Sequence, residues 1–184
     1  MSHRMGRDKL LLDYNGKLIL QHSVDLLCML PVYERILITS DARVQSISIP
    51  ANIAVRINSQ PESGISKSIQ IGVEASTGTH YLFLNADQPK LKISDLTKMI
   101  EAADANPDKI IHPEIDSKPC SPTLFPGYFR DELLYLSHDP DVNKRDAGGR
   151  TIRDANKPLC IAIVPEDPTR YIDIDNTDDY MQII

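Results

Sequence analysis

Short apolar runs alternate with helically spaced apolar residues along most of this chain. The runs at 35–40, 53–57 and 81–84 are rich in aliphatic or aromatic residues and are followed by polar residues, which predicts buried strands. Between them, apolar residues recur three or four positions apart at 20–27 and 66–75, a spacing typical of helices. The first half of the chain therefore predicts strands and helices in turn.

The second half continues the alternation with shorter elements. Ser94 occupies the position of an N-cap, and the apolar residues after it predict a helix. Asn176 or Thr177 is expected to cap a final helix. The remaining elements are predicted strands at 110–111, 123–125, 159–164 and 171–175, and predicted helices at 133–136 and 151–155.

Strands that alternate with helices at this spacing favour one α/β domain over residues 1–184, with a mostly parallel sheet covered by helices on both faces. No internal repeat, low-complexity tract or linker interrupts the sequence. Ligands of such sheets bind beyond the carboxyl ends of the strands. Polar residues that follow the predicted strands are therefore the first candidates for a functional site.

Composition narrows the range of partners. Hydrophobic residues make up 41% of the chain and charged residues 25%, which is typical of a soluble globular protein. The formal net charge of −6 argues against a protein that binds nucleic acid by neutralising its phosphates. It leaves room for a small anionic substrate, because a local cluster of Arg and Lys can hold phosphates on an acidic protein.

Cysteine usage and hydropathy indicate the compartment. The 3 cysteines have no CxxC spacing, so we expect neither a disulfide framework nor a zinc site, and a reducing compartment suits them. The start of the chain has no apolar signal core, and no run approaches the length of a membrane span. We expect a cytoplasmic protein with no membrane partner, present as a monomer or weak dimer.

The segment at 2–9 places three cations and a glycine ahead of the first predicted helix. Gly6 would let backbone N–H groups approach phosphate oxygens, and Arg4 and Lys9 can neutralise a triphosphate. A solvated chain end is the alternative interpretation, and for a short basic start taken alone it is the better one.

Asp87 follows the predicted strand at 81–84, where parallel sheets place their ligands. Its carboxylate is a hard oxygen ligand suited to Mg²⁺, which commonly takes one or two carboxylates together with substrate phosphates. An Asp that begins a turn before Pro89 is an equally good interpretation of the position alone.

A second acidic candidate lies near the end of the sequence. Asp173 and Asp175 alternate along a predicted strand and should share one of its faces. Asp178 and Asp179 fall in the first turn of the final predicted helix, where negative charge complements the helix dipole. A structural role therefore explains the second pair well and the first pair less well.

Between these acidic residues, Asn58 and the segment at 64–68 precede a predicted helix. Small residues and hydroxyls at a helix N-terminus suit the recognition of a base, a ribose or an anion. Simple capping by Ser66 is an equally good local interpretation.

Taken in order, these segments resemble the motifs of the molybdenum-cofactor cytidylyltransferase family, a group of MobA-like NTP transferases. Four blocks carry the resemblance over nearly the whole chain, and the ordered set is far more specific than any one block. The blocks are Ser2-x-Arg4-Met5-Gly6-x-x-Lys9-Leu10-Leu11-Leu12, Asn58 with Gly64-x-Ser66-x-Ser68, Asn85-Ala86-Asp87-Gln88-Pro89, and Asp173-Ile174-Asp175-Asn176-Thr177-Asp178-Asp179-Tyr180. A looser likeness at 146–150 implies a block near the acceptor.

The resemblance implies a Rossmann-like, three-layer nucleotidyltransferase fold of the nucleotide-diphospho-sugar transferase type. It also implies catalytic roles for Arg4 and Lys9, which would bind the triphosphate, and for Asp87. Asp87 and Asp175 would hold Mg²⁺, with Asp173 as a helper. The residues that would frame the nucleotide are Ser2, Gly6, Asn58, Gly64, Ser66 and Ser68.

Three departures from the family pattern are visible. The family's first motif follows a buried strand ending in Leu-Ala-Ala-Gly or similar, which this sequence lacks, so we expect Met1 to be an internal methionine of a longer chain. Ser121 stands where relatives often have Asn or His, which alters the expected acceptor contacts. Arg145 replaces a usual Gly.

The activity implied by the resemblance is transfer of CMP from CTP to the phosphate of molybdopterin, with release of pyrophosphate. The implied cofactor is Mg²⁺, and the implied partners are CTP, a molybdopterin-type cofactor and a molybdenum hydroxylase. Two alternatives stay open. One is a guanylyltransferase of the same fold, although Gln88 after Asp87 favours the cytidylyl branch. The other is a non-catalytic chaperone that delivers cofactor to molybdenum hydroxylases.

Overall fold

The computed structural model describes residues 8–182, so the predicted contributions of Ser2, Arg4 and Gly6 lie outside the described residues. The strands are β1 (Asp13–Tyr14), β2 (Lys17–Leu18), β3 (Ile36–Thr39), β4 (Ala54–Ile57), β5 (His80–Phe83), β6 (Ile110–Ile115), β7 (Lys118–Pro119), β8 (Thr123–Pro126) and β9 (Cys160–Ile163). The helices are α1 (Ile19–Met29), α2 (Asp41–Val44), α3 (Ile65–Ala75), α4 (Ile93–Ala105), α5 (Arg130–Tyr135), α6 (Val142–Ala147), α7 (Gly149–Ala155) and α8 (Thr177–Met181).

The main sheet has the strand order β5–β8–β6, with β7 and β9 also paired to β6. Both β5 and β6 run antiparallel to β8, and β9 runs parallel to β6. It follows that β5, β6 and β9 point the same way and β8 is reversed between them. Their carboxyl ends and the amino end of β8 therefore meet at one edge of the sheet.

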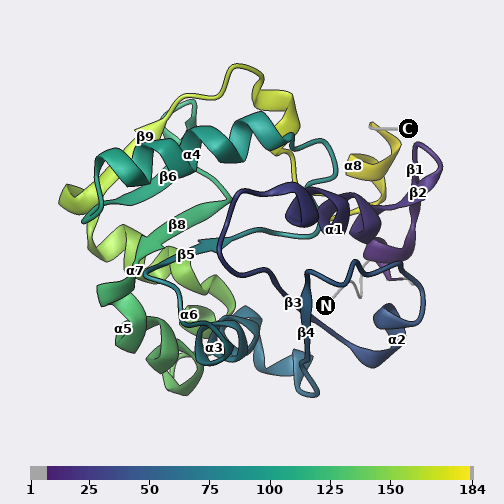
Figure 1. Cartoon of the computed structure of the whole chain (residues 1–184), viewed down its shortest axis with the longest axis horizontal. Helices are drawn as coiled ribbons and strands as arrows, with labels where there is room; N and C mark the ends of the chain where they lie inside the picture. Colours follow the sequence, from purple (N-terminus) through teal and green to yellow (C-terminus); the bar gives the residue numbers. More distant parts are fainter. Residues whose placement is uncertain (1–7, 183–184) are drawn as a thin grey trace.

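Alternating side chains bury both faces of this sheet. Ile111 and Leu124 belong to a core that includes residues of α1 and α4. Their chain neighbours Ile110 and Phe125 belong to a second core with residues of α3, α5 and α7. Because successive strand residues point to opposite faces, β6 and β8 each contribute to both cores. The arrangement, with α4 over one face and α5–α7 over the other, confirms the predicted α/β class (Figure 1).

A separate two-stranded parallel sheet is formed by β3 and β4. Within residues 8–182 it shares no ladder with the main sheet. Side-chain hydrogen bonds to the two ends of α3 hold it in place. Glu34, before β3, accepts from Ser76 Oγ at 2.8 Å and from the N–H of Thr77 at 2.9 Å. Asn58, after β4, donates to Ser68 Oγ at 3.0 Å.

A third, smaller core lies under the β1–β2 hairpin and α1. It consists of Leu10, Ile19, Leu20, Val24, Ile53 and Ile174. The predicted cap of the final helix is confirmed, because Asn176 Oδ1 accepts the N–H groups of Asp178 and Asp179 at 2.8 and 3.0 Å. The Tyr180 hydroxyl donates to the Asp13 carbonyl at 2.6 Å, so α8 docks on the hairpin.

Two local predictions are wrong. Helix α4 begins at Ile93 rather than after Ser94, and an acid in its first turn replaces the expected serine cap. The carboxylate of Asp95 accepts the N–H of Lys92 at 2.9 Å and pairs with Arg170 at 3.1 Å. The segment at 171–175 is not a strand, because it follows a 3₁₀ turn and has no neighbour with which to form a ladder in the described structure. No helix in the described part of the chain combines the length and apolar character that crossing a membrane requires.

Candidate active site

The first component of the site is Lys9, which sits in a fixed 3₁₀ turn. Asp8 caps this turn by accepting the N–H of Leu10 at 3.2 Å. Arg43 donates two hydrogen bonds to the same carboxylate, from Nε to Oδ2 at 2.6 Å and from Nη2 to Oδ1 at 3.1 Å. Because Leu10 is buried, the backbone of Lys9 is held from both sides and its side chain is the part that can reorient.

The second component lies beyond the carboxyl end of β5. The Ser23 hydroxyl of α1 donates to the Ala86 carbonyl at 3.2 Å, which ties this loop to the first helix. The Asp87 carbonyl accepts the N–H of Ile174 at 3.0 Å. Ile174 is fully buried, so this contact fixes the residues on either side of it against the end of β5. Asp175 is brought to Asp87 in this way.

Lys9 joins the two acidic positions directly. Its ammonium lies 2.7 Å from Asp87 Oδ2 and 3.0 Å from Asp175 Oδ1 (Oδ–Nζ distances). These partners are 78 and 166 positions away along the chain, so three separately predicted motifs meet at one point. Burial opposes the positive charge of Lys9, but the two carboxylates outweigh this effect and raise its pKa.

The carboxylates fit a hard divalent cation. Asp87 Oδ1 is buried and has no hydrogen-bond partner within residues 8–182, so one acceptor oxygen of this carboxylate is unused. Among residues 8–182, no cluster of three or more His, Cys, Asp or Glu side chains could hold a metal by itself. An Asp87–Asp175 pair is therefore suited to Mg²⁺ that completes its coordination with water and phosphate oxygens.

A third carboxylate, that of Asp173, lies close to the pair. The side chain of Asp173 is exposed on its outer surface, but the surrounding protein still desolvates its carboxylate. This desolvation, and then the charges of Asp87 and Asp175, raise the pKa of Asp173 to about 6. Lys9 and Arg150 oppose this shift. The predicted alternation survives without a strand, because Ile174 points inward while its two acidic neighbours point outward.

The second predicted motif has a different character, because its side chains bond within the protein. Asn58 is buried, donates to Ser68 and accepts the N–H of Gln60 at 2.9 Å. Ser66 is fully buried, and its hydroxyl donates to the Arg145 carbonyl. The capping interpretation of Ser66 is wrong, since Gly64 occupies the N-cap position of α3. A nucleotide contact from this segment stays a prediction.

Gly64 is required by its surroundings. Its φ of +87° lies in the region that favours glycine. A Cβ added here would also stand 2.5 Å from Asp146 Oδ1 and 3.2 Å from the Arg145 carbonyl oxygen. The C-terminal end of α6 therefore packs directly on the start of α3, which joins the block at 146–150 to the predicted nucleotide segment.

Two residues that support the site were not identified by sequence reasoning in these roles. Gln88 is buried, and its amide nitrogen donates to the carbonyls of Ser121 at 3.2 Å and Tyr171 at 3.0 Å. It thus links the Asp87 loop to the amino end of β8 and to the chain before Ile174. Arg43 had no local signal, because its partner Asp8 lies 35 positions away.

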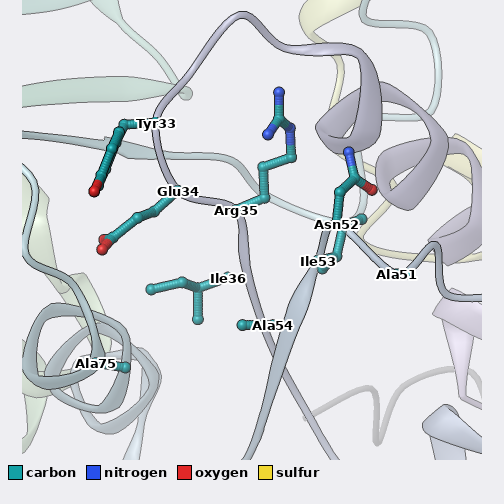
Figure 2. A pocket seen from close by; sticks show the side chains of 9 residues that line it. All are labelled: Tyr33, Glu34, Arg35, Ile36, Ala51, Asn52, Ile53, Ala54 and Ala75. Carbon is teal, nitrogen blue, oxygen red and sulfur yellow. The ribbon is translucent and has the colours of Figure 1, made fainter.

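A pocket of about 320 Å³ lies elsewhere, before the amino ends of β3 and β4 (Figure 2). In Figure 2 the side chains of Tyr33 and Glu34 point away from those of Arg35 and Asn52. Several of its polar groups are already paired, since Glu34 bonds to Ser76 and Asn52 bonds to Cys28. The acidic site beyond the carboxyl end of β5 is the better candidate for chemistry.

Comparison with known proteins gives one family match and several relatives. Residues 1–158 match the family model described as the MobA-like NTP transferase domain. A probable molybdenum cofactor guanylyltransferase from Rhodopirellula baltica is 28% identical over 116 residues, which are 60% of this chain and 54% of that protein. This chain thus spans about half the length of that curated relative.

Solved structures support the fold. Rv0371c from Mycobacterium tuberculosis H37Rv superposes with a TM-score of 0.78 at 20% identity, covering 98% of this chain and 90% of that one. A manganese complex of the same protein has a TM-score of 0.76 at 20% identity and covers 97% and 92%. At these identities the likeness establishes a common fold and nothing finer.

Proposed function

Because this chain belongs to the family of MobA-like NTP transferase domains, we propose that it is a Mg²⁺-dependent nucleotidyltransferase that transfers CMP from CTP to the phosphate of a molybdopterin-type acceptor. The observation that carries the proposal is the meeting of Lys9, Asp87 and Asp175 beyond the carboxyl end of β5. Two carboxylates can hold a magnesium ion and a lysine can bind phosphate, and the ligands of α/β sheets bind at this edge.

In the proposed reaction, an oxygen of the acceptor phosphate attacks the α-phosphorus of CTP. The bond from that phosphorus to the bridging oxygen of the β-phosphate breaks, and pyrophosphate leaves. Such a transfer depends on positioning and charge neutralisation rather than on a covalent protein nucleophile. The absence of a nucleophile from the proposed residue set is therefore expected.

The residues have separate roles in this scheme. Asp87 and Asp175 would hold the magnesium ion, which when bound neutralises phosphate charge and orients the phosphates. Lys9 donates to phosphate oxygens and stabilises the negative charge that develops on the leaving pyrophosphate. Arg4, which precedes the described residues, is the proposed second cation. Gln88 positions Asp87 by fixing the loop that follows it.

The proposed ligands are carboxylate oxygens, which suit either Mg²⁺ or Mn²⁺. One neighbour of this chain is described as a manganese complex, and Mn²⁺ accepts the same oxygen ligands as Mg²⁺. The unpaired Asp87 Oδ1 supplies an oxygen of this kind here.

GTP is the second candidate substrate, because the curated relative is named a probable molybdenum cofactor guanylyltransferase. Gln88 is a weaker argument for CTP than its place in the sequence suggests, because the residue is 2% exposed and its amide already bonds to two backbone carbonyls. The choice of CTP therefore rests on the ordered motif set.

A thermal melt with Mg²⁺ alone, then with CTP and then with GTP, tests the proposal. A ligand that binds only the folded protein raises its melting temperature by mass action. At a ligand concentration of a hundred times Kd, the free energy of unfolding increases by about 2.7 kcal/mol. We expect CTP with Mg²⁺ to stabilise the protein more than GTP does. A larger shift with GTP assigns the guanylyl branch, and no shift with either nucleotide contradicts the nucleotide site.

Turnover is then measured as pyrophosphate release with molybdopterin as acceptor. Release that requires CTP, Mg²⁺ and acceptor together is the expected result. Tight binding of the acceptor without release would instead favour the chaperone alternative and a molybdenum hydroxylase as the partner.

A further inference from the structure

The ammonium of Lys9 stands where a cation shared by Asp87 and Asp175 would have to stand. It lies 2.7 Å from one carboxylate and 3.0 Å from the other. A magnesium ion binds oxygen ligands at roughly 2.0–2.1 Å, so an ion between the same two oxygens would occupy the space of the ammonium. The two cations therefore exclude each other.

We propose that Lys9 is an internal competitor for the metal. Its ammonium pairs with the two carboxylates until the metal binds together with a nucleotide, whose phosphates then bind the ammonium instead. The inference rests on the proposed function and extends it from a list of ligands to an order of events. Metal alone must displace a paired charge. Metal with a nucleotide triphosphate offers that charge a new partner, so the two ligands favour each other's binding.

The surroundings of Lys9 suit such an exchange. Asp8 and Arg43 hold its backbone, while its long side chain keeps several rotatable bonds. The side chain is 16% exposed, which leaves it a route to solvent. Asp87 Oδ1 is buried and has no hydrogen-bond partner among the described residues, so this carboxylate keeps acceptor capacity that the ammonium on Oδ2 does not use.

The decisive variant is Lys9→Met, which keeps much of the side-chain length and removes the charge. We expect it to bind Mn²⁺ alone about tenfold more tightly than the wild type, because two carboxylates lose their competing cation. We also expect nucleotide to lose most of its effect on Mn²⁺ affinity. Arg150→Gln is the matched control, since Arg150 acts on Asp173 of the same acidic group but forms no pair with Asp87 or Asp175 in the described structure.

Mn²⁺ affinity is read by electron paramagnetic resonance of the free ion, without nucleotide and then with CTP or GTP. A tighter Mn²⁺ site in Lys9→Met but not in Arg150→Gln supports the proposal. Equal or weaker binding in Lys9→Met overturns it, and so does an equal gain in both variants, which would indicate general electrostatics. The titration without nucleotide stands even if neither nucleotide binds, so the two proposals fail separately.

A second measurement uses the wild-type protein and so does not depend on how the variant folds. Reductive methylation followed by peptide mass spectrometry compares Lys9 with Lys17, a lysine that pairs with Asp25 away from the site. Added Mg²⁺ and nucleotide analogue should change the labelling of Lys9 severalfold and leave Lys17 unchanged. Mg²⁺ alone at high concentration should expose Lys9 to labelling. Unchanged labelling of Lys9 at a saturating metal concentration would overturn the proposal.

Discussion

Two predicted binding segments of this protein differ in how their polar groups are satisfied. At the acidic site, Lys9 is shared between two carboxylates, and one oxygen of Asp87 has no hydrogen-bond partner in the part of the chain that the structure describes. At the start of α3, Asn58 and Ser66 are buried and bonded to other parts of the chain. The first segment has unused capacity for a ligand, whereas the second uses its side chains to hold α3.

Motif residues of one family can therefore serve either ligand binding or the stability of the fold. A buried polar atom without a partner costs free energy in the empty protein, which a ligand recovers on binding. A buried polar atom with a partner contributes to stability and offers a ligand little. Substitutions in the acidic site should therefore change activity, and substitutions at the start of α3 should change stability.

The largest expected effect is that of Asp87→Asn on turnover. The substitution keeps the shape of the side chain and removes the charge, so we expect nucleotidyl transfer to fall at least about a thousandfold. The melting temperature without ligands should change little, because the Lys9 pair is partly exposed to solvent. Pyrophosphate release and a thermal melt check both halves. Asp178→Asn, in the first turn of α8, is the control that should keep activity, and full activity in Asp87→Asn would remove Asp87 from the proposed chemistry.

The next effect in size is that of Gly64→Ala on stability. The new Cβ would meet both a positive φ and the carboxylate of Asp146, so we expect a loss of about 3 kcal/mol in the free energy of unfolding. Gly16→Ala is the matched control, because Gly16 also has a positive φ but, among the described residues beyond its chain neighbours, no atom within 4 Å of the added Cβ. Its loss should be about 1 kcal/mol. Denaturant unfolding of both variants measures the difference, and equal losses would mean that the packing against Asp146 contributes nothing.

The smallest effect concerns Asp173 and depends on pH. Its pKa is raised from 3.8 to about 6, so the folded protein binds a proton that the unfolded chain has released between these values. Wild-type stability from this group is therefore lost as the pH rises from about 4 to 6. Asp173→Asn should raise the melting temperature by about 1–2 °C at pH 7.5 with chelator present, and the gain should vanish near pH 4. A gain of the same size at both pH values would show that the carboxylate charge is not its cause.

Sequence patterns located the elements of this fold better than their pairing. The strands β3 and β5, the helices α1 and α3, and the cap Asn176 are formed largely by local residues, and they are present as expected. The reversed direction of β8 had no signal, because it depends on pairing with β5 and β6 rather than on its own four residues. Residues 171–175 alternate like a strand but have no pairing strand in the described structure. Their alternation instead places Ile174 in the core, with acidic residues on either side of it.

The site shows the same division. Motif residues identified Lys9, Asp87 and Asp175, since each lies next to a predicted element of the right type. Their supports Arg43 and Gln88 were not identified as such, because a side chain that bonds to backbone or carboxylate many positions away leaves no periodic trace. The internal use of Ser66 was also hidden, since its partner is the carbonyl of Arg145, 79 positions away.

The separation of the site residues along the chain has a consequence for folding. The contacts of Lys9 with Asp87 and Asp175 close loops of 78 and 166 positions, and the second spans most of the 184 residues. Such long-range contacts carry a large loop-closure entropy and form late, after the local hairpins and helices. The acidic site is thus assembled only when nearly the whole domain is already folded, and it acts as a reporter of complete folding.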